Sequence, residues 1–486
     1  MAERLEHKVV SGVAWSLSEK LLTMVIQMAV SIIVARSLSP DDFGVMAILT
    51  FFMSVALTIV DSGFSQTLIR KANPTNEEYA SVLGFNVAMS LLLYALLVAA
   101  APYVASFYDS SIIEDVAPIL FLVLPINSLC VVQTVLFTRE FRFALLSKTV
   151  FAASLISGVV AIVMAVTGWG IWALVAQRLL MMGIKAVVFW WVRRWRCGVG
   201  FSLAALREML PFSMRLLATD LIAAIYNNVA QLFIGKMHST NLLGFYSQAQ
   251  KLKDLPVIST VQAIQGVTYP ALSQLADDDE KFDAAYRRIV RLLSYLIFPV
   301  MLGLIAIADD MFLLLLGERW MPTVPYFEIL ALSGMVYPLS VVAYNVLKVR
   351  SDGRIIVRLE IVRRVVMTLI LACCIPQGVE AVAWGMSAMA VVDMSLNVVA
   401  AGRYTRFGML SFLQVVLPHL LLAALMFGLL WLLQPYFAGL SLALRLGVDV
   451  AVGVAIYVVC SLLLRVSAFG ESLALLRGLF SKNLFE

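Results

Sequence analysis

The sequence from Leu242 to Gln274 reads LLGFYSQAQKLKDLPVISTVQAIQGVTYPALSQ. It is long and apolar enough to cross a bilayer, yet it carries Lys251, Lys253 and Asp254. At 100° per residue, eight of its polar positions fall within roughly 140° of one another. These are Ser247, Gln248, Lys251, Asp254, Ser259, Gln262, Gln265 and Tyr269. Because ionisable groups at membrane depth usually face a bundle interior or a wet cavity, this polar stripe predicts a helix that lines a water-filled pathway for an anion.

Composition indicates that the rest of the chain is of the same kind. Hydrophobic residues make up 62% of the 486 residues and charged residues 14%, with a mean hydropathy of +0.93. A polytopic membrane protein is therefore predicted, and nothing suggests a nucleic-acid partner. The five cysteines and three histidines form no metal-binding pattern. No Walker-type phosphate loop is present, so no cofactor is expected beyond a possible H⁺ or Na⁺ gradient.

Fourteen apolar segments approach the roughly 20 residues that a bilayer requires. They are approximately 13–34, 43–69, 82–104, 116–137, 145–166, 170–192, 210–234, 242–270, 289–308, 325–347, 355–375, 379–401, 411–433 and 442–464. No connecting loop exceeds about twenty residues, which leaves no place for a soluble catalytic domain. The pattern predicts an all-α polytopic protein that is not an enzyme.

Lysine and arginine are distributed unevenly over the two ends of these segments. Of the 36 basic residues, 24 lie on the side of the N-terminus and four on the opposite side. Because cytoplasmic loops carry the excess of positive charge, both termini are predicted to be cytoplasmic.

Two parts of the chain repeat each other. Arg36–Gly44 and Lys236–Gly244 match in their basic residue, serine and glycine 200 positions apart, and both fall between successive segments. An even number of helices in each half gives parallel repeats related by an axis along the membrane normal. We therefore expect an N-terminal lobe at 1–205 (helices 1–6) and a C-terminal lobe at 206–405 (helices 7–12). Residues 406–486 hold two more helices and a cytoplasmic tail.

Several short motifs carry a family resemblance. They are Arg36 through Gly44, Asp61-Ser62-Gly63, Gly244-Phe245-Tyr246 with Gln250, Lys251 and Pro256, Tyr269 through Ser273, Phe298-Pro299 with Gly303, and Gly317 through Trp320 before Pro325. Over residues 8–405 the chain resembles the polysaccharide-export flippases related to the colanic acid exporter, in the multidrug/oligosaccharidyl-lipid/polysaccharide transporter superfamily.

The resemblance implies two lobes around a central cavity in the bacterial inner membrane. It also implies alternating access that moves an undecaprenyl-diphosphate-linked oligosaccharide from the cytoplasmic to the outer leaflet, for exopolysaccharide or O-antigen assembly. The implied partners are this lipid-linked oligosaccharide, membrane lipids and, further, the polysaccharide polymerase machinery.

A diphosphate needs a wet, cationic route, since moving an unneutralised charge through hydrocarbon costs many kcal/mol. The substrate-binding candidates are Lys251, Arg215, Gln248, Gln262, Arg363 and Arg364. Lys251 and Arg215 have an alternative role as side chains that snorkel toward an interface. Glu360 precedes Arg363 and Arg364 by three and four residues, so at most one of the two arginines is expected to be left unpaired. Lys253, opposite the stripe, is expected in an interhelical salt bridge.

Buried acids are candidates for ion coupling, since a carboxylate can load and release a proton between the two leaflets. These candidates are Asp61, Asp220, Asp393 and Glu19, with Asp449 as a further intramembrane acid. The alternative role of Glu19 is a local ion pair with the adjacent Lys20. The alternative role of Asp61, which precedes Ser62-Gly63, is that of a helix cap or hinge.

Two other functions remain open at this point. A cation-coupled multidrug antiporter of the same architecture would favour an acidic cavity, whereas the basic candidates above favour an anionic cargo. A membrane-embedded polysaccharide polymerase or ligase would need a sizeable outer loop. The longest outer loops expected here, near Tyr108–Asp115 and Asp309–Thr323, are short.

Overall fold

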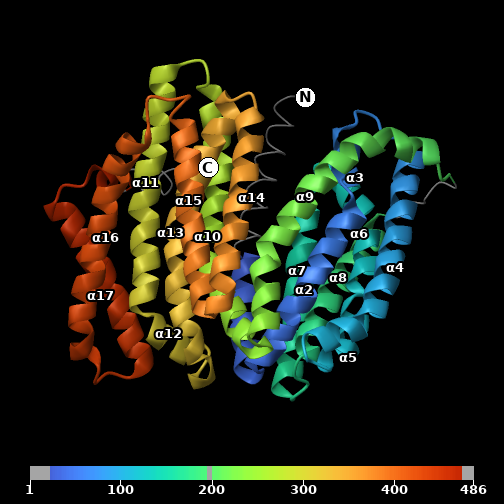
Figure 1. Ribbon diagram of the computed structural model, residues 1–486, viewed down its shortest axis with the longest axis horizontal. Coiled ribbons are helices and arrows are strands. Elements are labelled where there is room, and N and C mark those ends of the chain that lie inside the picture. Colours follow the sequence, from blue (N-terminus) through green and yellow to red (C-terminus); the bar gives the residue numbers. More distant parts are fainter. Residues whose placement is uncertain (1–21, 194–199, 473–486) are drawn as a thin grey trace. The chain divides into compact units, whose positions relative to one another are not determined.

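The computed structural model describes residues 22–193 and 200–472, and every regular element in these ranges is helical (Figure 1). Within them, eleven spans are long and apolar enough to cross a membrane, which confirms the all-α polytopic class. The other three predicted segments correspond to Leu22–Ser37, α10 (Thr240–Gln274) and α14 (Arg354–Cys374). These three are not among the eleven spans, so the count of fourteen stays a prediction.

The described residues up to Ser247 form one compact unit, and those from Gln248 form a second. The helices of the first unit are α2 (Pro40–Asp61), α3 (Phe64–Arg70), α4 (Asn76–Phe107), α5 (Ile112–Leu120), α6 (Val123–Arg139), α7 (Phe143–Val166), α8 (Trp172–Val192) and α9 (Leu203–Met237). Those of the second are most of α10, α11 (Asp279–Ala306), α12 (Ala308–Leu315), η1 (Glu318–Thr323), α13 (Val324–Arg350), α14, η2 (Ile375–Gln377), α15 (Val379–Ala401), α16 (Met409–Phe437) and α17 (Leu442–Leu463). The lobe boundary predicted at 205/206 stays a prediction, and α9 belongs to the first unit here.

Short polar signals in the sequence fix where several of these helices begin. Ser39 precedes α2 and accepts a hydrogen bond from the backbone of Asp42 (3.3 Å), while the Asp42 carboxylate accepts one from the backbone of Ser39 (2.9 Å). Thr75 and Glu78 form the same reciprocal pair at the start of α4. Such capping boxes satisfy backbone N–H groups that the first helical turn leaves without partners.

Two regions expected as outer loops contain helices of their own. α5 begins halfway through the first region, and α12 followed by η1 occupies most of the second. The apolar residues of these short helices explain the difference. Ile113, Phe312 and Trp320 are buried, so the segments fold back onto the bundle instead of running through solvent.

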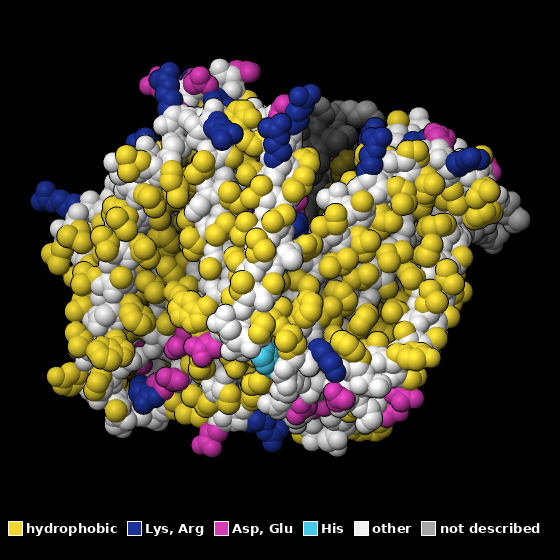
Figure 2. Space-filling model, viewed as in Figure 1, with side chains coloured by type: hydrophobic (Ala, Val, Ile, Leu, Met, Phe, Trp, Pro, Cys, Tyr) yellow, Lys and Arg dark blue, Asp and Glu magenta, His cyan; other side chains and the backbone are white. Residues whose placement is uncertain are grey.

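Each unit has its own packed interior. In the first, α2 packs on α9 and α4, and α7 packs on α8. In the second, α13 packs on α15, and α11 packs on α13 and α16. Tyr286 and Phe407 meet edge to face in the second interior, with ring centroids 5.0 Å apart. Taken by itself, each unit shows hydrophobic side chains across its middle and charged ones at its upper and lower edges (Figure 2), as expected for helices that face lipid.

The repeated stretches at Arg36–Gly44 and Lys236–Gly244 pack against each other within the first unit. A Cβ added to Gly44 would lie 1.9 Å from the carbonyl oxygen of Thr240, and one added to Gly244 would lie 1.9 Å from that of Pro40. Asp41 also accepts hydrogen bonds from Thr240 (2.8 Å) and Asn241 (3.0 Å). The two glycine contacts are reciprocal at an offset of 200 residues, as a two-fold relation between the repeats requires. The repeat over twelve whole helices stays a prediction.

Candidate functional site

A break in the second predicted span places Asp61 at the edge of a cavity. α2 ends at Asp61, and the next two residues are left-handed, with φ of 45° at Ser62 and 70° at Gly63. A left-handed serine is uncommon, and such residues cluster at functional sites. Gly63 is required for a second reason, because a Cβ there would come within 2.9 Å of the carbonyl oxygen of Ser213 on α9.

Hydrogen bonds hold the broken helix in place. The hydroxyl of Ser65, on the first turn of α3, donates to the Asp61 carboxylate at 2.5 Å. Thr67 and Ser213 share a hydrogen bond of 2.9 Å that ties α3 to α9. Arg139 on α6 donates to carbonyl oxygens at the end of α3, where helix carbonyls lack intrahelical partners. Asp61 is therefore a helix-terminal residue with a fixed carboxylate.

This carboxylate lines a cavity of about 500 Å³ within the first unit. α9 contributes Asp220, α8 contributes Lys185, and α6 contributes polar groups such as Asn127 and Thr134. Two carboxylates and one ammonium give the lining a formal charge of −1. Oxygen ligands and net negative charge suit a proton or a small monovalent cation. The structure thus brings together two of the four predicted ion-coupling acids.

A second charge cluster lies in the second unit, across α13, α14 and α15. Arg363 on α14 contacts the carboxylate of Asp393 on α15 and donates to Glu360 at 2.5 Å. Arg364 also pairs with Glu360. Ser340 on α13 donates to Asp393 at 2.7 Å and accepts a hydrogen bond from Asn397 at 2.8 Å, which closes the network across three helices.

The network is electrically neutral, with two arginines and two carboxylates. The side chains of Arg363 and Asp393 are only 20% and 17% exposed, so each charge depends on its partner. Both arginines that the sequence offered as substrate-binding candidates are paired here. Asp393, offered for ion coupling, is held by Arg363 and Ser340.

The remaining predicted site residues are dispersed. Lys251, Gln262 and Arg215 have exposed side chains, whereas Gln248 is fully buried, and its side-chain amide has no hydrogen-bond partner among the described residues. Glu19 lies outside the described residues. The polar stripe of α10 is therefore exposed at some of its positions and buried at one.

The partner of Lys253 differs from the one expected. Its Nζ lies 2.6 Å from the carboxylate of Asp254 on the same helix, so the predicted interhelical bridge is wrong. Adjacent residues point in different directions on a helix, but the long lysine side chain can bend back to a neighbouring carboxylate.

Ser340 and Asn397 were not predicted from the sequence. Neutral hydroxyls and amides in apolar helices carry no charge signal, and Ser340 lies far from its partners in the chain. Asn397 offered one clue, since it follows Asp393 by four residues and therefore shares its helix face.

An apolar cavity of about 450 Å³ lies between α11 and α17 in the second unit. Asp449 lines it and is fully buried, and neither of its carboxylate oxygens has a hydrogen-bond partner among the described residues. Tyr295 and Tyr457 form the opposite end, joined by a hydrogen bond from the Tyr457 hydroxyl to the Tyr295 carbonyl (2.7 Å). Asp449 is thus a lone acidic group in apolar surroundings.

The bundle and its buried charges define a polytopic membrane protein of the transporter class. The chain belongs to the polysaccharide biosynthesis protein family, whose model matches residues 33–325, more than half of its length.

Two of its relatives are similar over most of both chains. The teichuronic acid biosynthesis protein TuaB of Bacillus subtilis (strain 168) is 22% identical over 479 residues, covering 96% of this chain and 97% of its own. The succinoglycan biosynthesis transport protein ExoT of Rhizobium meliloti (strain 1021) is 26% identical over 380 residues, covering 77% of this chain and 76% of its own.

Solved structures show where the fold occurs elsewhere. The lipid II flippase MurJ in an inward closed conformation matches with a TM-score of 0.74 and 12% identity, over 93% of this chain and 99% of that one. An inward-facing multidrug resistance MATE transporter matches with a TM-score of 0.61 and 15% identity, over 82% and 94% of the two chains. The fold is shared by flippases and multidrug transporters, so it does not by itself select the cargo.

Proposed function

We propose that this protein is a flippase that moves an undecaprenyl-diphosphate-linked oligosaccharide from the cytoplasmic to the outer leaflet of a bacterial inner membrane. It acts as a transporter and not as an enzyme, with both termini in the cytoplasm. It passes its cargo on for exopolysaccharide or O-antigen assembly by polysaccharide polymerase machinery.

The observation that carries the proposal is the family match, because relatives in it are named for the biosynthesis and transport of polysaccharides. A lipopolysaccharide biosynthesis protein of Escherichia coli (strain K12), WzxC, is 20% identical over 341 residues and supports the same class of cargo. The fold shared with a lipid II flippase supports the flipping step, since that protein's named cargo is also lipid-linked.

Cation coupling supplies the driving force in this proposal. The cavity that holds Asp61 and Asp220 has a net negative charge and an open volume, both of which suit H⁺ or Na⁺. The neutral network around Arg363 and Asp393 suits a structural role instead. We therefore assign coupling to the first unit and omit Asp393 from it.

The diphosphate then follows the exposed polar positions of α10, with Lys251 as its principal cationic contact and Arg215 of α9 as a second. Both side chains are exposed. A charge-assisted contact of this kind contributes roughly 1–3 kcal/mol when partly desolvated, which is about a tenfold to hundredfold change in binding.

Deletion of the gene tests the proposed function directly. We expect the lipid-linked oligosaccharide to accumulate in the cytoplasmic leaflet and polymer export to cease, and a plasmid copy to restore export. A deletion strain with normal export and no accumulated intermediate would overturn the proposal.

Substitutions at Lys251 test the route. Lys251→Glu should reduce polymer export most, Lys251→Ala should reduce it by about tenfold or more, and Lys251→Arg should retain part of it. Lys253→Ala, whose lysine pairs with Asp254, is the matched control and should export near normally. Full export by Lys251→Glu at ordinary protein level would remove Lys251 from the route.

A multidrug antiporter is the second candidate, and the acidic cavity of the first unit is the observation that favours it. Efflux of a fluorescent lipophilic cation from intact cells separates the two functions. If the protein is a flippase, the deletion strain and the complemented strain should retain the fluorescent cation equally. Greater retention in the deletion strain, together with normal polymer export, would select the antiporter.

A further inference from the structure

A pocket lined by four polar and five apolar residues lies in the second unit where four helices end or begin, away from the charge clusters described above. Its volume is about 410 Å³, within the range of about 300–1,000 Å³ that small-molecule sites occupy. The end of α11 and the start of α12 form one wall, and the end of α16 and the start of α17 form the other. Helices α16 and α17 lie outside the predicted twelve-helix repeat.

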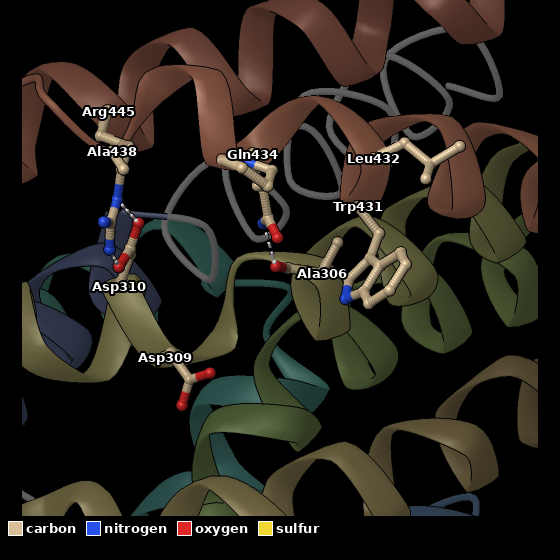
Figure 3. Close-up of a pocket in the computed structure, with 9 residues that line it drawn as sticks. Ala306, Asp309, Asp310, Trp431, Leu432, Gln434, Ala438 and Arg445 are labelled. Atoms are coloured by element: carbon tan, nitrogen blue, oxygen red, sulfur yellow. Dashed lines mark hydrogen bonds and ion pairs between the residues drawn. The ribbon is translucent and has the colours of Figure 1, made fainter.

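Two interactions hold the frame of this pocket. Arg445 on α17 binds the carboxylate of Asp310 on α12 through two nitrogens. Gln434 on α16 donates from Nε2 to the carbonyl oxygen of Ala306 at 2.7 Å. Figure 3 shows Arg445 and Asp310 directed at each other and Gln434 directed at Ala306. Both contacts join the α16–α17 pair to the α11–α12 corner, so the pocket is formed before any ligand arrives.

The lining combines an aromatic ring with acidic and amide oxygens. Trp431 on α16 is 64% exposed although it lines the pocket, and its indole lies beside Ala306 (Figure 3). Asp309 adds a second, exposed carboxylate, and Gln434 retains its Oε1 as an acceptor. An exposed ring and hydrogen-bond acceptors in one lining match a ligand with one apolar face and several hydroxyl donors.

The charge of the pocket selects between ligands. Asp309 and Asp310 carry two negative charges and Arg445 one positive charge, so the lining has a formal charge of −1. Because Arg445 already binds Asp310, no cation is left to neutralise a phosphate, and a diphosphate would be repelled. Hydroxyl groups that donate to a carboxylate, in contrast, make charge-assisted hydrogen bonds.

We propose that this pocket binds one neutral sugar residue of the transported glycan, with its pyranose ring stacked on Trp431 and its hydroxyls donating to Asp309. The assignment rests on the proposed flippase function for the source of the sugar. It gives α16 and α17 a role in holding the glycan, separate from the cationic route of the diphosphate.

Saturation-transfer-difference NMR on the full chain in phosphatidylcholine nanodiscs tests the pocket. The probes are methyl glucoside, methyl galactoside, N-acetylglucosamine, glucuronate and phosphoethanolamine. We expect signals from at least one neutral sugar and weaker ones from glucuronate. Trp431→Ala and Asp309→Asn should lower the neutral-sugar signal at least about fivefold, and Trp431→Phe should retain part of it.

Trp384→Ala is the matched control, because Trp384 on α15 is also an exposed tryptophan (51%) but does not line the pocket. It should leave the sugar signal unchanged, and thermal melting should show all variants folded. Equal signals from the unaltered chain and Trp431→Ala would overturn the proposal. A signal from phosphoethanolamine alone would make this a lipid-headgroup site. A glucuronate signal as strong as that of the neutral sugars would refute the charge argument.

The outcome is separable from that of the proposed function. If deletion of the gene causes no accumulation of lipid-linked oligosaccharide, the flippase function fails whatever the NMR signals show. If the protein restores export but binds no sugar at Trp431, only the sugar pocket fails.

Discussion

In the first unit Asp61, Asp220 and Lys185 border an open cavity of about 500 Å³, whereas in the second unit Arg363 and Asp393 belong to a network whose charges bind one another. Both groups consist of ionisable residues on helices that the sequence places in the membrane. The difference lies in what neutralises them. Arginine and carboxylate neutralise each other in the second unit, while the cavity of the first unit keeps an uncompensated negative charge.

Intramembrane charge alone therefore does not mark a transport site. A paired charge is held by its partner, and removing one member leaves the other unneutralised in a poorly hydrated place. An unpaired carboxylate on a cavity can instead exchange its counter-ion or proton. Stability should therefore depend on the second unit's network, and transport on the first unit's cavity.

The largest effect is expected from breaking the network. Arg363→Ala leaves Asp393 without its arginine, and we expect it to cost about 2–4 kcal/mol of stability, measured as thermal unfolding in detergent. Arg363→Leu combined with Asp393→Leu should recover much of this loss, because Glu360 and Arg364 still pair. Arg358→Ala, on an exposed position of the same helix, is the control. A double variant as unstable as the single one would contradict the pairing argument.

A steric change in the first unit separates packing from charge. Gly44→Ala places a Cβ 1.9 Å from the carbonyl oxygen of Thr240, so the two chain segments must move apart. We expect a loss of about 1–3 kcal/mol in the same unfolding assay. Gly183→Ala in α8 is the matched control, since open space surrounds it and alanine favours helix by up to about 1 kcal/mol. Equal behaviour of the two variants would refute the close contact.

Removing the charge at Asp61 tests whether transport depends on the cavity of the first unit. Asp61→Asn keeps a polar partner for Ser65 but loses the negative charge of the cavity. We expect the export rate to fall by about tenfold, which corresponds to about 1.4 kcal/mol in the activation free energy of transport, with an unchanged melting temperature. The dependence of export on the ion gradient should also vanish. Asp109→Asn, an exposed acid of the same unit, should export normally. A destabilised Asp61→Asn with normal export per molecule would assign Asp61 a structural role.

The smallest effect concerns the lone acid of the second unit. Asp449 is fully buried in an apolar cavity without a hydrogen-bond partner among the described residues. A charged or hydrogen-bond-poor carboxyl is costly there, so Asp449→Asn should raise stability by up to about 1 kcal/mol. Asp352→Asn, on an exposed turn, should leave stability unchanged. A lower melting temperature for Asp449→Asn would show that the carboxylate has a stabilising partner.

Much of the fold was predictable because a helix needs about 20 apolar residues to cross a bilayer, and runs of that length are visible in the sequence. Charge patterning does not specify side-chain partners in the same way. Glu360 and Arg363 lie three residues apart on one helix, so their pairing followed from helical geometry. Lys253 was assigned a distant partner and has a neighbouring one, since a flexible lysine side chain is not constrained by the helical period.

The amino-acid sequence is enough to identify the membrane class, the family resemblance and the acids and bases available for transport. Which of these acids and bases share a site depends on how the helices pack. Asp61 and Asp220 are 159 positions apart, yet α2 and α9 bring them to one cavity because Gly63 lets the two helices approach closely. Arg445 and Asp310 likewise meet only because α17 packs on α12. Helical periodicity relates residues within one helix, whereas contacts between helices depend on packing that no local pattern encodes.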